Sequence, residues 1–142
     1  MALVIVLLLL AAAFAEGSGR ELSGYYGKDI AEAANELGGL TYSAGGEFDD
    51  NYVSDALALR GTGGKVTFID LKAGPDSLCG VSVGMTREDA QALMEGCPKL
   101  WEYDEEVAWI TRADAQNELN SETLVAFFDE DGRVSGAWYR AS

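Results

Sequence analysis

The chain is 142 residues long and strongly acidic, with 24 acidic against 10 basic residues and a formal net charge of −14 at pH 7. This charge argues against nucleic acid and anionic membrane surfaces as partners, because both attract clusters of Lys and Arg. The hydrophobic content of 48 % is enough for one buried core, and the absence of histidine removes the commonest general base and metal ligand.

Residues 1–15 form an uncharged, almost wholly apolar run that ends in Ala13-Phe14-Ala15. A membrane-spanning helix needs roughly 20 apolar residues, so this run is short for one, and its end matches the A-x-A pattern cut by signal peptidase. We therefore predict a signal peptide at 1–15 and a secreted or cell-envelope protein, without stable membrane insertion after cleavage. The basic segment that opens most signal peptides is missing, so an uncleaved anchor or a start further upstream is the alternative.

Two cysteines, Cys79 and Cys97, bracket the segment 83–96. Export would place them in an oxidising compartment, where an even number of cysteines favours a disulfide. A Cys79–Cys97 disulfide would close a short loop and contribute about 3 kcal/mol to stability. The alternative is two separate buried thiols. Structural zinc sites use four nitrogen or sulfur ligands, so two cysteines without histidine do not predict one.

The first half opens with a polar, glycine-rich leader at 16–24, which we expect to be flexible. A helix follows, with Asp29 as its N-cap, Glu32 three residues on as in a capping box, and Gly38 at its end. Its apolar face is formed by residues at helical spacing, namely Ile30, Ala33, Ala34 and Leu37. A strand at 40–44, a loose loop at 45–55 and a strand–turn–strand unit at 56–72 are predicted next.

The second half has the same order of signals. The segment 83–96 predicts a helix capped by Thr86, which lies 57 residues after Asp29. The segment 123–140 predicts another strand–turn–strand unit, in which Arg133-Val134 follows Lys65-Val66 by 68 residues. The second half is therefore longer between helix and hairpin, and a further strand with a long polar loop is expected at 107–120.

These signals predict an α+β fold built as a tandem repeat of a helix followed by antiparallel strands, with the helices packed on one face of the sheet. The first repeat spans 25–74 and the second 75–142. Alternating apolar and polar positions in the strands favour a sheet with one covered and one open face. Chance similarity is the alternative, because capped amphipathic helices before hairpins are common.

Three motifs of the second half are distinctive: Gly84-Met85-Thr86 at the helix start, Gly96-Cys97-Pro98 after the helix, and the acidic hairpin from Phe127 to Val134. Together they resemble the SmpA/OmlA (BamE) type of small envelope domain. The tandem arrangement is similar to the β-lactamase-inhibitor proteins, and this resemblance implies two joined helix–sheet units that bind a target on a concave sheet. The predicted cleavage site has no lipid-anchor cysteine, and no inhibitory contact residue can be carried over. The resemblance therefore specifies a fold far better than a function.

Aromatic residues of the second half are the candidate protein-binding residues: Trp101, Tyr103, Trp109, Trp138 and Tyr139. Trp and Tyr are typical anchors of protein interfaces. In the last strand, alternation predicts that Val134, Gly136 and Trp138 share one face. The alternative is that Trp109 and Trp138 fill the core under the helix.

Acidic and glycine-rich segments predict no further site. The segment 129–132 begins like a calcium loop, but Arg140 stands where that loop needs its last acid, so we expect a hairpin turn with Gly132 at positive φ. The acidic segment 47–55 could bind calcium, although no ligand spacing stands out and a solvated loop is the simpler interpretation. Gly61–Gly64 precede a strand rather than a helix, so they form no phosphate cradle.

The favoured hypothesis is an exported, non-enzymatic module that binds another protein through the open face of its sheet, in the manner of an inhibitor. It requires no catalytic residue, metal or cofactor, and its partner is a protein. Two alternatives remain: an envelope structural or maintenance domain tethered by an uncleaved N-terminus, and a hydrolase that uses two carboxylates converging in a pocket.

Overall fold

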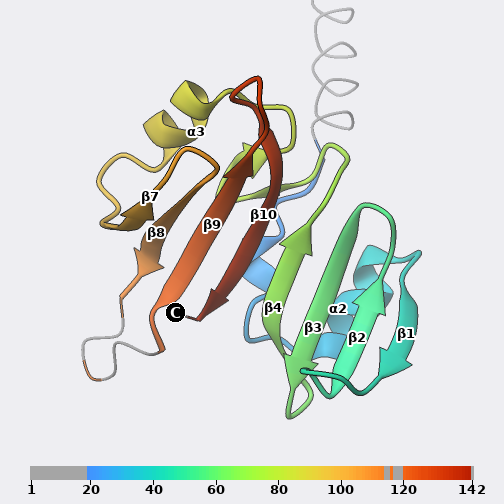
Figure 1. Ribbon diagram of the computed structural model, residues 1–142. Helices are drawn as coiled ribbons and strands as arrows, with labels where there is room; N and C mark the ends of the chain where they lie inside the picture. The colour runs from blue at the N-terminus through green and yellow to red at the C-terminus, as the bar shows by residue number, and fades with distance from the viewer. Residues whose placement is uncertain (1–18, 114–115, 117–119, 142) are drawn as a thin grey trace, which may run out of the picture.

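The computed structural model describes residues 19–113, 116 and 120–141, so the predicted signal peptide at 1–15 lies outside the described residues. Within them, eight strands form one antiparallel sheet in the order β1-β2-β3-β4-β10-β9-β8-β7 (Figure 1). These strands are β1 (Thr41–Ala44), β2 (Asp50–Val53), β3 (Leu57–Thr62), β4 (Lys65–Leu71), β7 (Lys99–Glu102), β8 (Glu106–Arg112), β9 (Glu122–Phe128) and β10 (Val134–Ala141). The remaining elements are the 3-10 turn η1 (Ser23–Tyr25), the helices α2 (Ile30–Leu37) and α3 (Arg87–Leu93), and a hairpin of β5 (Ser77–Leu78) and β6 (Val81–Ser82). The α+β class predicted from the sequence is confirmed.

Both helices begin where the sequence predicts. The carboxylate of Asp29 accepts a hydrogen bond of 2.9 Å from the backbone N–H of Glu32, and the hydroxyl of Thr86 accepts one of 3.2 Å from the N–H of Asp89. Such caps satisfy backbone donors that have no partner inside the helix. After α2 the chain turns at Gly38, whose φ of 73° is unfavourable for residues with a side chain.

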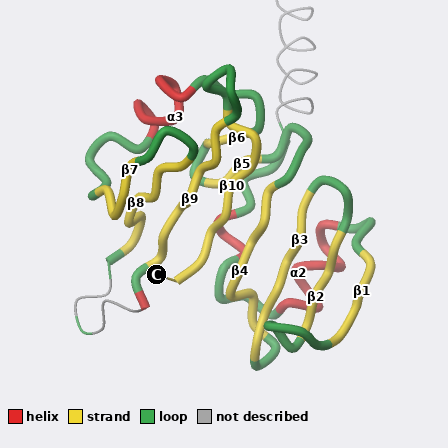
Figure 2. The backbone as a smooth tube through the Cα atoms, viewed as in Figure 1, coloured by secondary structure: helices red, strands yellow, loops and turns green. Residues whose placement is uncertain are grey.

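One face of the sheet is covered by the two helices and holds the core. In Figures 1 and 2, α2 lies behind β2 and β3. The helices contribute Ile30, Ala33, Ala34, Leu37, Ala90 and Met94 to a single hydrophobic cluster. The strands contribute Leu57, Leu59, Val66, Ile69, Leu71, Val107, Trp109, Leu124, Ala126, Phe128, Val134, Ala137 and Tyr139 to the same cluster. We call the opposite side of the sheet the open face, because no helix of the described residues covers it.

The first and second halves of the chain meet at the centre of the sheet, where β4 pairs with β10. Asp70 lies opposite Trp138, and Phe68 lies opposite Arg140. Segments almost seventy residues apart in the sequence are therefore neighbours, and the sheet is continuous across the junction (Figure 1).

The leader predicted as flexible at 16–24 is fixed from residue 19 onward, so that prediction is wrong for its described part. Leu22 is fully buried in the core. Arg20 forms an ion pair of 3.0 Å with Asp76, and the carboxylate of Glu21 accepts hydrogen bonds from the N–H groups of Cys79 and Gly80 at 2.8 and 2.7 Å. All these partners lie more than fifty residues away in the sequence, so local composition gave no sign of them.

The predicted disulfide is not formed. Cys79 and Cys97 are both free, and both lie half-buried beside the core. Cys79 occupies the turn of the β5–β6 hairpin with φ of 54°, whereas Cys97 follows α3. Burial, together with the negative charge of Glu21, raises the pKa of the Cys79 thiol to about 11. Thiol oxidation proceeds through the thiolate, and the raised pKa lowers the thiolate fraction of Cys79.

Two predictions about loops also have an outcome. The strand expected at 40–44 is confirmed as β1, but the segment 45–55 is not wholly a loop, since it contains β2. Asn51 allows a polar strand here, because its buried amide donates hydrogen bonds to the carbonyls of Ser43 and Gly45 at 3.2 and 3.0 Å. No helix among the described residues is long and apolar enough to cross a membrane.

Candidate functional site

The five aromatic residues predicted as a binding set do not lie on one surface. Trp109 and Tyr139 are 1 % and 5 % exposed and belong to the core. Trp101 and Trp138 point to the open face, and Tyr103 is exposed in the turn between β7 and β8. Alternation explains the division, because consecutive residues of a strand point to opposite faces. The alternative core assignment is therefore confirmed for Trp109 and wrong for Trp138.

A β-bulge in β10 corrects the predicted face of its first residue. Val134 pairs with Phe128 and Gly136 with Phe127, so Ser135 is an extra residue on β10. The bulge resets the alternation, and Val134 points into the core while Trp138 points to the open face.

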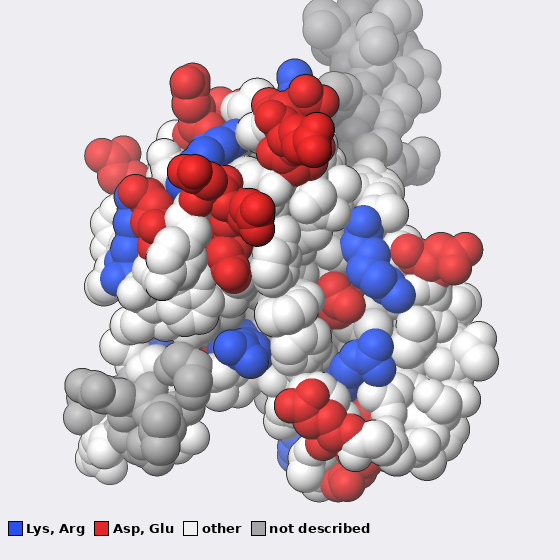
Figure 3. Space-filling view, viewed as in Figure 1, with Lys and Arg blue, Asp and Glu red and all other residues white. Residues whose placement is uncertain are grey.

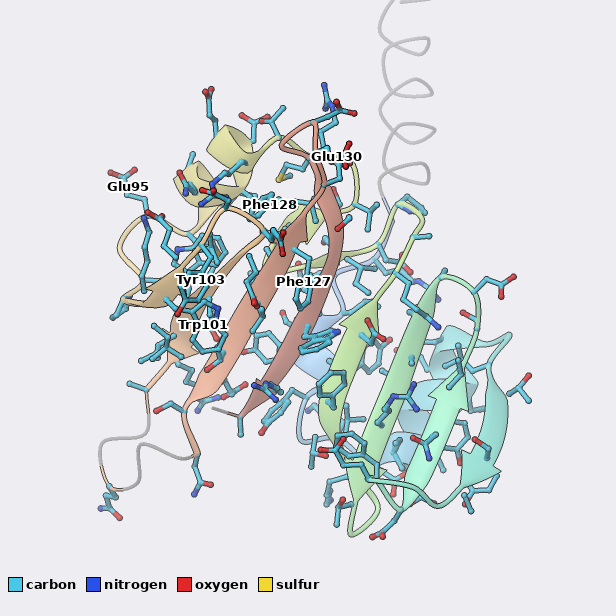
Figure 4. All side chains as sticks on the ribbon, in the orientation of Figure 1. Glu95, Trp101, Tyr103, Phe127, Phe128 and Glu130 are labelled. Carbon is cyan, nitrogen blue, oxygen red and sulfur yellow. The ribbon has the colours of Figure 1, made fainter. Side chains whose placement is uncertain are left out.

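Four aromatic rings form a row across the open face. Phe48, from the loop between β1 and β2, lies 5.5 Å from Phe68 of β4 between ring centroids. Phe68 lies 5.4 Å from Trp138 of β10, and Trp138 lies 4.7 Å from Phe127 of β9 in an edge-to-face arrangement. All four are half-buried, and Figure 4 labels Phe127 on the second half of the sheet, with Trp101 and Tyr103 further out on the β7 side. Sequence reasoning identified only Trp138. Alternation from the buried Val66 assigns Phe68 to the core face, but the bulge at Thr67 turns Phe68 to the open face.

A hollow of about 490 Å³ lies beside this row, over β3, β4 and β10. Its walls are Glu47, Phe48, Arg60, Thr67, Phe68, Asp70, Trp138, Arg140 and Ala141. Figure 3 shows basic and acidic side chains side by side over these strands, whereas acidic side chains predominate at the turn that joins β9 and β10. The hollow therefore combines aromatic walls with charges of both signs.

The two arginines of the hollow differ in their contacts. Arg60 donates a hydrogen bond of 2.7 Å from Nη1 to the side-chain oxygen of Asn51. The guanidinium of Arg140 lies over the Trp138 ring at 5.8 Å from its centroid, and its Nε is buried without a hydrogen-bond partner in the described residues. The hydroxyl of Thr67 is likewise buried without a partner there. Unpaired buried polar groups cost free energy, so both atoms are places where the folded chain leaves a hydrogen bond unmade.

Asp70 is the half-buried carboxylate of the hollow. Burial raises its pKa, and the charges of Lys72 and Arg60 together with the Trp138 indole act in the opposite direction. Asp70 and Glu47 line the same hollow, so two carboxylates are present on the open face.

Metal binding gains no support from the acidic segments. Within the described residues, no three metal-binding side chains converge, and this covers the segment 47–55. The segment 129–132 forms the expected turn, in which Gly132 has φ of 73° and Asp129 accepts hydrogen bonds from the N–H groups of Asp131 and Arg133.

Comparison with solved structures shows the fold. An extracellular protein containing an SCP domain from Bacillus anthracis str. Ames matches with a TM-score of 0.60 and 9 % identity, over 86 % of this chain and 46 % of that protein. A cysteine-rich secretory protein from Staphylococcus aureus subsp. aureus Mu50 matches with a TM-score of 0.52 and 10 % identity, over 84 % of this chain and 44 % of that protein. This chain therefore spans less than half the length of either. No protein-family model and no curated protein sequence matches it.

Proposed function

We propose that this chain is an exported, non-enzymatic module that binds another protein through the open face of its sheet. The row formed by Phe48, Phe68, Trp138 and Phe127 is the observation that carries this proposal. The rings are half-buried side by side and already ordered against one another, so a partner would lose little side-chain freedom in covering them. Aromatic anchors of this kind dominate the free energy of protein interfaces.

The proposed architecture is a tandem repeat, and matching backbone hydrogen bonds in the two halves support it. In the first half, Gly27 N–H bonds to Val66 O, Val66 N–H to Lys28 O, and Ile30 N–H to Gly64 O. In the second half the same three bonds join Gly84 to Val134, Val134 to Met85, and Arg87 to Gly132. Every helix-side residue is displaced by 57 positions and every strand-side residue by 68, which are the two offsets expected from the sequence.

The two proposed units also share their sheet pattern. Each consists of a helix followed by four antiparallel strands, and each carries a bulge at an equivalent residue, Thr67 or Ser135. The residue equivalent to Asp70 in the second unit, 68 positions later, is Trp138, which is also its partner across β4 and β10. The two proposed units are therefore related by an approximate two-fold axis that passes through this pair. The hollow lies at this junction, where two joined units create a surface that neither has alone. A β-lactamase-inhibitor-like mode of binding, on the sheet formed by two units, suits this arrangement.

Export is the proposed context. The predicted signal peptide at 1–15 supports it, and the two structures of similar fold are described as extracellular and secretory proteins. An envelope domain tethered by an uncleaved N-terminus is the alternative, and mass spectrometry of the mature N-terminus separates the two. Retention of residues 1–15 would favour tethering.

Capture of a partner by the expressed full-length chain tests the proposal. We expect Trp138→Ala to weaken binding of the captured protein at least about 30-fold, which corresponds to about 2 kcal/mol, the lower bound for an interface hot spot. Tyr42→Ala is the matched control, because Tyr42 is exposed but its register places it on the helix side of the sheet. Equal binding by both variants would reject the open face as the binding surface.

A second candidate function, carboxylate-based hydrolysis, rests on Glu47 and Asp70 lining one hollow. It predicts turnover of glycoside or ester substrates that Asp70→Asn abolishes. The favoured proposal predicts that Asp70→Asn changes no turnover above the background rate of the uncatalysed reaction.

A further inference from the structure

Arg140 differs from every other arginine of the chain in its polar contacts. Arg20, Arg60, Arg87 and Arg133 each donate a hydrogen bond to a carboxylate, a carbonyl or an amide oxygen, and Arg112 forms an ion pair of 3.7 Å with Glu122. Within the described part of the chain, no hydrogen bond or ion pair joins the guanidinium of Arg140 to an acceptor, its Nε is buried without a partner, and it lies over the Trp138 ring. In a chain with 24 acidic residues, an arginine that forms no ion pair within the described residues, although two carboxylates line the same hollow, indicates a missing acceptor.

The backbone register places this arginine in a defined row. Arg60 of β3 pairs with Phe68 of β4, and Phe68 pairs with Arg140 of β10. Two strand spacings separate the arginines, roughly 10 Å, with the Phe68 ring between them. Trp138 belongs to the next pair along β4 and β10 and lies beside Phe68. The two rings and the guanidinium of Arg140 therefore line the same hollow.

The chemistry of a guanidinium specifies the missing acceptor. Its planar donors match the two oxygens of a carboxylate, and such pairs are shorter and stronger than neutral hydrogen bonds. The aromatic walls supply apolar area for a residue next to that carboxylate.

The acidic residues that line the hollow do not serve as the acceptor for Arg140. Asp70 pairs in register with Trp138, and the positive charges that stabilise its ionised form are those of Lys72 and Arg60 rather than Arg140. The net negative charge of the chain repels an acidic partner only over short range, because charges more than about 8 Å apart are screened at physiological ionic strength.

A carboxylate of a side chain fits better than one at a peptide C-terminus. C-terminal carboxylates are typically held by free backbone N–H groups in a nest. At this hollow, β3, β4 and β10 each lie between two paired strands, so their backbone donors serve the sheet ladders. The available donors are side chains that rise from the middle of the sheet.

We propose that Arg140 receives the carboxylate of an Asp or Glu side chain of the partner protein, with an adjacent apolar side chain of that partner on Phe68 and Trp138. This inference rests on the proposed function, since it names the chemistry that the open face selects. It makes Arg140 the residue that confers specificity, whereas the aromatic row supplies contact area.

Nuclear magnetic resonance of the ¹⁵N-labelled full-length chain tests this directly, because the Nε–H group of each arginine gives its own signal. The probe is the blocked tripeptide acetyl-Phe-Glu-Phe-amide at millimolar concentration, compared with acetyl-Phe-Gln-Phe-amide and with acetyl-Phe-Gln-Phe bearing a free C-terminal carboxylate. We expect the Glu peptide to shift the Arg140 signal and to bind at least about tenfold more tightly than the blocked Gln peptide.

Two variants complete the test. Arg140→Gln should remove the preference for Glu over Gln, and Arg112→Gln should retain it, since the Arg112 side chain is 81 % exposed and pairs with Glu122. Equal binding of the Glu and Gln peptides, no binding of either, or an unchanged preference in Arg140→Gln would overturn the proposal. Binding of the C-terminal carboxylate alone would overturn the assignment to a side chain. Each of these results leaves the capture experiment with Trp138→Ala unaffected, so failure here and failure of the proposed function are distinguishable.

Discussion

The two faces of the central sheet use the same kinds of residue for different purposes. Tyr139 and Trp138 are consecutive in β10, yet Tyr139 is buried in the core and its hydroxyl bonds to Thr111 and Glu122 at 3.0 and 2.9 Å. Trp138 lies half-exposed on the open face between Phe68 and Phe127. Residue type does not decide which of these roles an aromatic residue has. The role depends on which face of the strand the residue occupies and on whether a helix covers that face.

The largest effect should come from the covered face. Trp109→Ala removes a side chain that is 1 % exposed and leaves a cavity under the helices. We expect a loss of about 3–5 kcal/mol in the free energy of unfolding, measured by urea titration. Trp138→Ala should cost less than half as much, because its ring is already partly in water. Equal losses for both variants would contradict the assignment of Trp138 to an exposed binding face.

The hairpin of β5 and β6, which also contributes to the core through Leu78 and Val81, should show an intermediate effect. The carboxylate of Glu21 fixes it, and although burial opposes ionisation, hydrogen bonds from Ser23, Gly80 and Cys79 lower the pKa of Glu21. This stabilisation is present above the usual glutamate pKa and is lost as pH falls through the lowered value.

Glu21→Gln should therefore destabilise the fold at pH 7 by about 1–2 kcal/mol, after allowance for the exposure of this side chain. The difference from the parent chain should shrink as the pH falls below about 4. Thermal unfolding monitored at several pH values measures both effects. A difference that does not change with pH would show that the carboxylate charge plays no part.

The smallest effect should come from the open face. Burial raises the pKa of Asp70, so the folded chain holds its proton to higher pH than the unfolded chain does. Stability should then fall as pH rises from the usual aspartate pKa through the raised value. Asp70→Asn should remove this decline and increase stability at pH 7 by less than about 1 kcal/mol, because the residue is only half-buried. A loss of stability instead would show that its contacts to Arg60 and Lys72 outweigh burial.

Local signals predicted the parts of the fold that depend on local chemistry. The caps at Asp29 and Thr86, the glycine after α2 and the turn at Gly132 all act within a few residues, and all are confirmed. The offsets of 57 and 68 residues could also be measured in the sequence, although their structural meaning depends on hydrogen bonds between distant segments.

The candidate site could not be assembled from the sequence, because it depends on three long-range events. The bulge at Ser135 resets which β10 residues face the core. The pairing of β4 with β10 places Phe68 beside Trp138 and Arg140. Phe48 reaches the row from a segment that has no apolar periodicity. The strand β7, with its polar ends and its own bulge, also gave no clear pattern.

A photo-crosslinking amino acid at position 138, with position 42 as the control on the opposite side of the sheet, tests whether the open face binds the partner. In the living host, we expect light to link the chain to one protein from position 138 and not from position 42. Crosslinks to that protein from position 42 alone, or from neither position while capture persists, would contradict the open face as the binding surface.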